Sequence, residues 1–168
     1  RKASLLAKAC LLLPGAIDPA RLPMDPVVRE LEAGREDSES WEPFAFVSRA
    51  LVAYRTGDLQ AAAGFADRAV RAAKSRDDAS LYQRVKIQVR PIEAMVEFRQ
   101  HGASDSVRTI LAEHQRELDE IISRHPDGTI VGESLLTEKG NANNTAVIGE
   151  LLRREAEQLI GESSKTAP

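Results

Sequence analysis

The sequence is poor in cysteine and has no long hydrophobic run. Its single cysteine, Cys10, has no partner for a disulfide bond, so nothing in the chain requires an oxidising compartment. Cys10 lies in the apolar run Ala9–Leu13, which is typical of a small buried hydrophobe rather than a nucleophile. No apolar run is longer than about five residues, whereas a helix that spans a bilayer needs roughly 20. We expect a soluble, cytoplasmic protein.

Aromatic residues and an excess of either charge are also scarce. Aromatics make up 4% of the 168 residues, whereas alanine occurs 24 times and leucine 17 times, a composition that favours close helix packing over a pleated sheet. The formal net charge is −3, so the chain lacks the basic character with which proteins neutralise phosphates. We therefore predict an all-α protein that does not bind nucleic acid.

Apolar spacing and helix breakers predict where the helices begin and end. The predicted helices cover 3–13, a short segment ending at 33, 41–56, a segment from 59, 79–100, a segment from 104 or 105 to 122, and 145–160. The segments 35–40, 125–128 and 129–144 are predicted to be loops or turns. Because Pro91 cannot donate a backbone hydrogen bond, it predicts a kink or a break near Arg90. Gly161 is expected to stop the last helix, so that residues 1–161 form one domain and 162–168 a disordered tail.

The segment around Gly57 predicts a tight helical hairpin. Thr56, Gly57 and Asp58 interrupt the helical pattern, and a new pattern begins at once with Leu59. The apolar face of this second helix consists mostly of alanine: Leu59, Ala62, Ala63, Ala66, Ala69 and Val70. Small side chains let two helix backbones approach closely, so we expect a thin seam between the two helices.

Polar residues at the predicted helix starts are candidate caps. Asp77 or Asp78 is expected to cap the helix from 79, Ser104 or Asp105 the next one, and the segment 143–145 the last. The helix after Gly102 has the clearest apolar face, formed by Val107, Ile110, Leu111, Leu118, Ile121 and Ile122. In the last helix, the residues expected to be buried are Val147, Ile148, Leu151, Leu152 and Leu159.

The segment 46–70 resembles a tetratricopeptide repeat. With Gly57 as the turn glycine, the matching positions are Phe46 and Ala50 in the first helix, and Ala62 and Ala69 in the second. A degenerate second copy can be aligned on Gly102. It places Met95 at the small position and Val107 at the first alanine position, but has His114 where the second alanine is expected. The resemblance implies stacked antiparallel helical hairpins, a tetratricopeptide-like right-handed superhelix of about two to three degenerate units.

Three further segments resemble the tetratricopeptide-bearing C-terminal regions of planctomycete serine/threonine protein kinases. They are Lys8–Pro14, Ala53–Leu59 and Leu151–Glu157, and their order along the chain also matches. The resemblance implies a bacterial, noncatalytic region carried behind a kinase or WD-repeat region. Because the sequence begins with Arg1 rather than Met, we expect it to be a fragment of a longer, kinase-containing protein.

No constellation in the sequence predicts catalysis. Kinase signature motifs are absent, and His101, His114 and His125 lack metal-ligand spacing. Two of these histidines, His101 and His125, are expected at helix C-termini, where positive charge interacts favourably with the helix dipole. Glu113 and Glu117 lie in an alternately charged segment that is typical of an exposed helix face. We therefore expect no enzymatic activity, no metal and no cofactor.

The tetratricopeptide resemblance implies a partner-binding groove lined by the first helix of each hairpin. The residues at these positions are Phe44, Val47, Leu51, Tyr54, Arg55, Ile92, Val96 and Arg99. An alternative is that Val47 and Leu51 are core residues beneath a neighbouring helix. The predicted function is protein or peptide binding or regulation, with the kinase domain in cis as one candidate partner. The alternative function is homo-oligomerisation, in which a homodimer buries the first-helix face.

Overall fold

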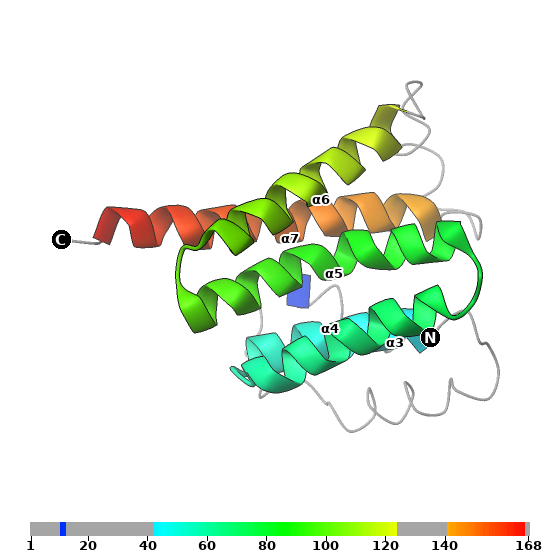
Figure 1. The fold of residues 1–168 in the computed structure, drawn as a ribbon, viewed down its shortest axis with the longest axis horizontal. Helices are drawn as coiled ribbons and strands as arrows, with labels where there is room; N and C mark the ends of the chain where they lie inside the picture. The colour runs from blue at the N-terminus through cyan, green and yellow to red at the C-terminus, as the bar shows by residue number, and fades with distance from the viewer. Residues whose placement is uncertain (1–10, 13–41, 124–140, 167–168) are drawn as a thin grey trace. The chain divides into compact units, whose positions relative to one another are not determined.

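Every element that the structure describes is a helix. The structure, a computed structural model, describes residues 11–12, 42–123 and 141–166. Its helices are α3 (Glu42–Arg55), α4 (Leu59–Lys74), α5 (Ala79–His101), α6 (Asp105–Ser123) and α7 (Asn141–Thr166) (Figure 1). The prediction of an all-α protein is confirmed. Within these ranges, no helix has the length and apolar character needed to cross a membrane.

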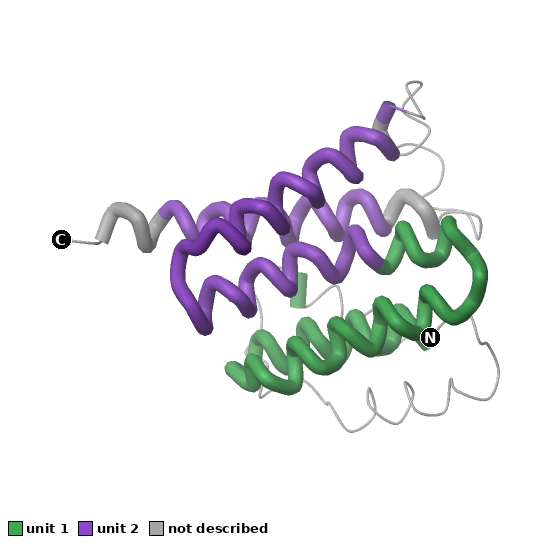
Figure 2. The backbone as a smooth tube through the Cα atoms, viewed as in Figure 1, with its two compact units in different colours: residues 1–85 green, residues 86–168 purple. Residues whose placement is uncertain are grey.

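Several predicted features lie outside the described residues. They are Cys10, most of the helix at 3–13, the short helix ending at 33, the loop at 35–40, the turn at 125–128 with His125, residues 129–140 and residues 167–168. Residues 11 and 12 are helical, as predicted. The chain divides into two compact units, Arg1–Val85 and Lys86–Pro168, with α5 crossing the boundary (Figure 2).

In the first unit, α3 and α4 form the predicted hairpin. At Gly57 the backbone has a φ of +83°, which glycine adopts without steric cost. The Gly57 N–H donates to the Tyr54 carbonyl at 3.1 Å and the Asp58 N–H to the Ala53 carbonyl at 2.9 Å, the pair of bonds of a Schellman motif. The Asp58 carboxylate then caps α4 by accepting from the Ala61 N–H at 2.9 Å. A few adjacent residues thus end one helix and start the next.

The seam of this hairpin is made of alanine. Four alanines on α4 are each at most 1% exposed: Ala62, Ala66, Ala69 and Ala73. Ala63, which was expected on this face, is exposed, while Leu59 and Val70 are only partly buried. An ion pair of 2.9 Å joins Arg76, just beyond α4, to Glu42 at the start of α3. The two helices are therefore antiparallel.

Local capping also starts the next two helices. The Asp78 carboxylate accepts from the Leu81 N–H at 3.0 Å, and the Ser104 hydroxyl accepts from the Val107 N–H at 3.2 Å. These bonds confirm Asp78 and Ser104 as caps. At the end of α5, Gly102 has a φ of +73° and donates its N–H to the Phe98 carbonyl at 2.8 Å. Gly102 therefore ends α5 in the left-handed conformation, as Gly57 does after α3.

The described residues of the second unit form three helices, α6, α7 and most of α5, in an up-down-up arrangement. One core cluster joins Ile87 early in α5, Leu118 late in α6 and Ala146 early in α7. The other core cluster joins residues late in α5, early in α6 and late in α7: Ala94, Phe98, Val107, Ile110, Leu111, Leu159 and Ile160. Because the early part of each helix meets the late part of the next, α5, α6 and α7 are successively antiparallel.

Of the kink or break predicted near Arg90, the break is wrong and the kink stays a prediction. Helix α5 runs without interruption from Ala79 to His101, and Pro91 is buried within it. Proline removes only the bond to the Ile87 carbonyl, four residues earlier. Side chains on both sides of Pro91 are fully buried, including those of Val89 and Ile92. Burial of this segment offsets the loss of one hydrogen bond.

Three predictions about the last helix are also wrong. Helix α7 begins at Asn141 rather than near residue 145, so the segment 143–145 is not its cap. Thr145 is instead a buried side chain that accepts a hydrogen bond of 3.2 Å from Gln88 of α5. Val147 was expected to be buried, but is 41% exposed. The helix also passes through Gly161 to Thr166, so residues 162–166 do not form the predicted disordered tail.

The physical reason for the continuation through Gly161 is nonlocal. Gly161 does not have the positive φ of Gly57 and Gly102, and a glycine without it costs a helix only about 1 kcal/mol. Leu159 and Ile160, immediately before it, pack in the second core cluster of the unit. This packing holds the helix past the glycine.

Candidate functional site

Most of the predicted groove residues are core side chains. Val47 and Leu51 on α3 are each 1% exposed, and Ile92 and Val96 on α5 are at most 4% exposed. Tyr54 is also buried. A partner could reach these five positions only after a helix had moved. Their burial agrees with the alternative interpretation, in which Val47 and Leu51 belong to the core, and partner binding at these positions stays a prediction.

The other three predicted residues, Phe44, Arg55 and Arg99, keep exposed surface. The Arg55 side chain donates from Nε to the Leu11 carbonyl at 3.0 Å, and its guanidinium carbon lies 5.5 Å from the centre of the Tyr54 ring. The guanidinium carbon of Arg84 lies 5.8 Å from the centre of the Phe44 ring. Arg99 lies in the second unit. The structure thus brings Tyr54 and Arg55 together near Leu11.

A group of arginine and phenylalanine side chains spans α3 and α4 and was missed by the sequence analysis. The rings of Phe46 on α3 and Phe65 on α4 stack with their centres 6.5 Å apart and their planes inclined by 18°. The guanidinium carbons of Arg49 and Arg68 lie 4.7 Å and 5.9 Å from the centre of the Phe65 ring. Both rings are half-buried. We call these four residues the Phe65 surface.

The sequence carries a signal for this surface that could have been recognised. A Phe-x-x-Arg pattern occurs at 46–49 in α3 and again at 65–68 in α4. Residues three apart in a helix lie on the same face, so each pattern places its phenylalanine and its arginine on one face of its helix. The antiparallel hairpin then brings the two patterns together. Arginine above an aromatic ring contributes about 0.5–1 kcal/mol at an exposed site.

Around the Phe65 surface, α4 is basic although the whole chain is slightly acidic. The helix has one acidic residue, Asp67, and three basic ones, Arg68, Arg71 and Lys74. Asp67 forms an ion pair of 2.6 Å with Arg71, and both side chains are more than half exposed. An exposed pair of this kind contributes about 0–1 kcal/mol. Arg71 and Lys74 lie in the last turn of α4, where positive charge interacts favourably with the helix dipole, whereas Arg68 lies further from this end.

Gly64, next to Phe65, is not required by the fold. It is exposed in the middle of α4, its φ is not positive, and a Cβ atom at this position would meet nothing within 4 Å. Glycine in a helix interior costs roughly 0.5–1 kcal/mol relative to alanine. The outer face of α4 therefore has a stretch of bare backbone beside Phe65 and Arg68.

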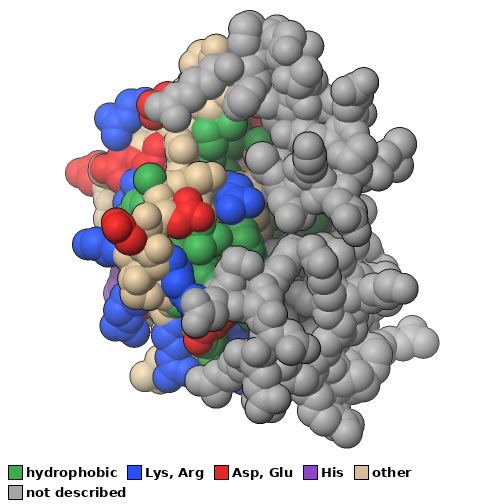
Figure 3. All heavy atoms as spheres, turned by 90° about the vertical axis from the view of Figure 1, so that its right-hand side faces the viewer, with side chains coloured by type: hydrophobic (Ala, Val, Ile, Leu, Met, Phe, Trp, Pro, Cys, Tyr) green, Lys and Arg blue, Asp and Glu red, His purple; other side chains and the backbone are tan. Residues whose placement is uncertain are grey.

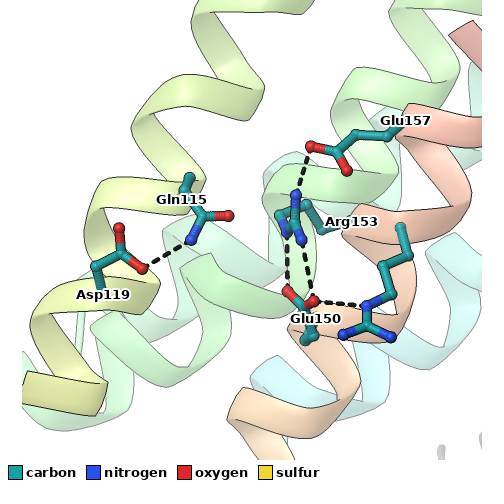
Figure 4. Close-up of polar contacts among 6 residues, drawn as sticks. Gln115, Asp119, Glu150, Arg153 and Glu157 are labelled. Atoms are coloured by element: carbon teal, nitrogen blue, oxygen red, sulfur yellow. Dashed lines mark hydrogen bonds and ion pairs between the residues drawn. The ribbon is translucent and has the colours of Figure 1, made fainter. Parts of the chain in front are cut away.

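The second unit has a network of ion pairs on α7. Glu150 accepts hydrogen bonds from Arg153 at 2.8 Å and from Arg154 at 2.6 Å, and Arg153 also pairs with Glu157 (Figure 4). The hydrogen bond from Arg153 has the largest effect on Glu150, and burial opposes it. The hydrogen bond from Arg154 and the positive charges of both arginines add to the first effect, so that the pKa of Glu150 is lowered to about 2. The hydrogen bond to Glu150 raises the pKa of Arg153. On α6, Gln115 donates to Asp119 at 2.7 Å (Figure 4).

The segment expected to be an exposed charged face of α6 is partly buried. Glu117 pairs with Lys86 of α5, and only 15% of its side chain is exposed. Glu113 pairs with Arg90 of α5 at 3.3 Å. These carboxylates therefore join α6 to α5 rather than face solvent alone.

His114, which replaces an alanine in the degenerate repeat, is fully buried. Neither ring nitrogen has a hydrogen-bond partner, and burial is the main reason that its pKa is lowered. His101, in contrast, ends α5 as predicted and lies 3.9 Å from Glu97. No group of three or more metal-ligating side chains occurs in the part of the chain that the structure describes.

Comparisons with known proteins do not identify a family for this chain. No protein-family model, curated protein or solved structure matches the chain. The described surface in Figure 3 intersperses Lys and Arg with Asp and Glu side chains, and hydrophobic side chains lie between them. The Phe65 surface combines two arginines with two half-buried aromatic rings, and we take it as the candidate functional site.

Proposed function

We propose that the chain is a noncatalytic protein-binding module of tetratricopeptide-like helical hairpins, which acts as a regulatory region of a larger kinase-containing protein. The Gly57 hairpin, with its alanine seam, and the second left-handed glycine at 102 support this proposal. The buried first-helix residues do not offer an open groove. The proposed contact site is therefore the Phe65 surface on the outside of the hairpin.

The single observation that carries the proposal is the pair of arginines beside the half-buried Phe65 ring. Arg49 and Arg68 come from two different helices, yet both lie within 6 Å of the centre of one ring. Aromatic residues, phenylalanine included, and arginine are enriched in the cores of protein interfaces. Gly64 leaves room for a partner backbone beside them.

The chemistry of this surface favours an acidic partner. Guanidinium groups bind carboxylates through two parallel hydrogen bonds, and the excess of basic residues on α4 attracts a negatively charged segment. The Phe46 and Phe65 rings would contact an apolar side chain of that segment. The proposed partner is thus a protein segment in which Asp or Glu residues flank an apolar residue, and a segment of the kinase region in cis is one candidate.

The same charge argues against homodimerisation through this surface. In a two-fold symmetric dimer the same patch lies on both sides of the interface, so the arginines of one copy would face a patch that carries the same arginines. Like charges brought together in an interface are unfavourable. Light scattering of the purified chain distinguishes the two functions, because the proposal expects a monomer, whereas a dimer that Arg68→Glu strengthens would support homo-oligomerisation.

The binding experiment begins with selection from a random peptide library displayed on phage. Peptides selected by the chain should carry Asp or Glu around an apolar residue. A selected peptide should then bind Arg68→Glu at least about tenfold more weakly, a loss of roughly 1.4 kcal/mol. Arg116→Glu is the matched control because Arg116 is also exposed on a helix, but lies on α6. Selection of nonacidic peptides, or equal binding by both variants, would contradict the proposal.

A further inference from the structure

His114 is an ionisable side chain in a place where no polar partner satisfies it. It lies on α6 with 0% of its surface exposed, and both Nδ1 and Nε2 are buried without a hydrogen bond. Buried polar side chains are hydrogen-bonded in the great majority of cases, so each exception requires an explanation. Alanine, which the repeat alignment expects here, would occupy this interior position without burying an unpaired polar group.

The imidazole ring of His114 packs against α7. Gly149 lies against the ring, so that a Cβ atom placed on Gly149 would lie 3.4 Å from Cε1 of His114. The same Cβ atom would lie 2.5 Å from Cγ2 of Ile87 on α5. His114 therefore occupies the point where α5, α6 and α7 meet. A methyl group on Gly149 would be in ordinary van der Waals contact with the ring, but it would clash with Ile87.

The charged groups that act on His114 come from its own helix and from α7. Glu117 lies one turn further along α6, and Glu150 and Arg153 lie on α7. On α5, Ile87 is apolar, and Lys86 binds Oε1 of Glu117, while Oε2 of Glu117 is buried without a partner. A proton on the ring would thus be near two carboxylates, each already paired with a basic side chain.

Burial outweighs these attractions and lowers the pKa of His114 below its ordinary value of 6.5. The backbone of Gly149 and the carboxylates of Glu117 and Glu150 oppose the effect, whereas Arg153 adds to it. As the pH falls below 6.5, the exposed ring of an opened state binds a proton before the buried ring does. The closed state is therefore favoured above pH 6.5 and loses stability as the pH falls towards the lower pKa.

We propose that proton uptake by His114 releases α7 from α6 and α5, which makes the second unit a pH-sensitive switch. An imidazolium enclosed by Ile87 and Gly149 has no water around it, and separation of α7 supplies that water. Glu117, whose Oε2 has no partner, lies one turn away on the same helix and favours the charged ring. The switch lies outside the Phe65 surface and does not depend on the proposed binding function.

Hydrogen exchange of the full chain, corrected for the pH dependence of intrinsic exchange, tests this proposal. Protection of α7 amides should fall between about pH 7.5 and about pH 5, by up to about tenfold per pH unit, the limit for one proton. In His114→Gln this dependence should disappear. His101→Gln, which changes an exposed histidine at the end of α5, should keep it.

Two results would overturn the proposal. One is a loss of protection in α3 and α4 as large as that in α7, because the chain would then unfold as a whole. The other comes from NMR titration of the Cε1 proton of His114 in the unmodified chain, which does not depend on whether His114→Gln folds. A midpoint at or above 6.5 would show that the closed state does not oppose protonation.

Discussion

Gly149 on α7 lies so close to Ile87 on α5 that no side chain fits between the two helices. A Cβ atom on Gly149 would lie 2.5 Å from the Ile87 Cγ2 atom and 3.1 Å from the Ile87 carbonyl oxygen. Pro91, four residues after Ile87, has no N–H to donate to this carbonyl. A proline in one helix and a glycine in another thus meet at one contact, where the bare backbone of α7 lies against the carbonyl that Pro91 does not bind.

Gly149→Ala should destabilise the protein. The added methyl group meets the backbone oxygen of Ile87 as well as its side chain, and overpacking of this kind costs about 1–3 kcal/mol. Urea unfolding of the full chain measures the change. Gly64→Ala is the matched control because Gly64 also lies inside a helix but has open space around it, so alanine should stabilise α4 by about 0.5–1 kcal/mol. Equal effects of the two substitutions would contradict the close contact.

Ala69→Leu tests the thin seam of the hairpin. Ala69 is 0% exposed on the face of α4 that packs against α3, and there is no room for three further carbon atoms. We expect a loss of about 1–3 kcal/mol in the free energy of unfolding. Ala63→Leu places the same side chain on the exposed side of α4 and should change stability by less than about 0.5 kcal/mol. A tolerated leucine at 69 would mean that α3 and α4 are not closely packed.

Asp58→Ala removes the cap of α4. The carboxylate accepts a hydrogen bond from the Ala61 N–H, so its loss should destabilise the hairpin by about 1 kcal/mol. Thermal unfolding followed by circular dichroism detects a change of this size. Asp67→Ala removes an equally acidic residue that forms only an exposed ion pair, and should have a much smaller effect. If the two variants unfold alike, Asp58 does not act as a cap.

The acid stability of the second unit should depend on Glu150. Hydrogen bonds from Arg153 and Arg154 lower its pKa from 4.5 to about 2. A lowered carboxylate pKa contributes stability above its ordinary value, and this contribution is lost as the pH falls from 4.5 to about 2. Glu150→Gln should remove roughly 1–3 kcal/mol of this pH-dependent stability.

Unfolding free energies measured across this acidic range check the prediction. Asp105→Asn is the control, because Asp105 pairs with Arg108 on an exposed surface of α6. Its loss should leave the dependence of the unfolding free energy on pH unchanged. If the unfolding free energy of Glu150→Gln depends on pH as that of the unmodified chain does, the Glu150 carboxylate is not the source of this dependence. The loss of stability attributed to His114 begins as the pH falls below 6.5, whereas that attributed to Glu150 begins near 4.5. The two effects can therefore be separated in one titration.

Features that depend on a few adjacent residues were predictable from the sequence. Gly57 and Asp58 end α3 and cap α4 through bonds within five residues, and Ser104 caps α6 in the same local way. Gly161 and Pro91 also disfavour a helix locally, but the burial of neighbouring side chains outweighs this local preference, so the helices continue through them. A helix breaker therefore predicted an end correctly only where no packing opposed it.

The candidate site was less predictable because it joins residues from different helices. Phe46 and Phe65 meet only once α3 and α4 are antiparallel, although the repeated Phe-x-x-Arg pattern was visible. The predicted groove placed Val47 and Leu51 on an open face, since apolar spacing does not tell a binding face from a core face. His114 seemed only a mismatch to the repeat, because Gly149, which packs against its ring, lies on another helix.

NMR titration of the labelled full chain with a selected acidic peptide tests the central claim most directly. The account predicts that backbone shifts change chiefly at Phe46, Arg49, Gly64, Phe65 and Arg68, and that added salt weakens the binding. Shift changes confined to α6 and α7, or binding that is indifferent to salt, would contradict the proposal that the Phe65 surface holds an acidic partner.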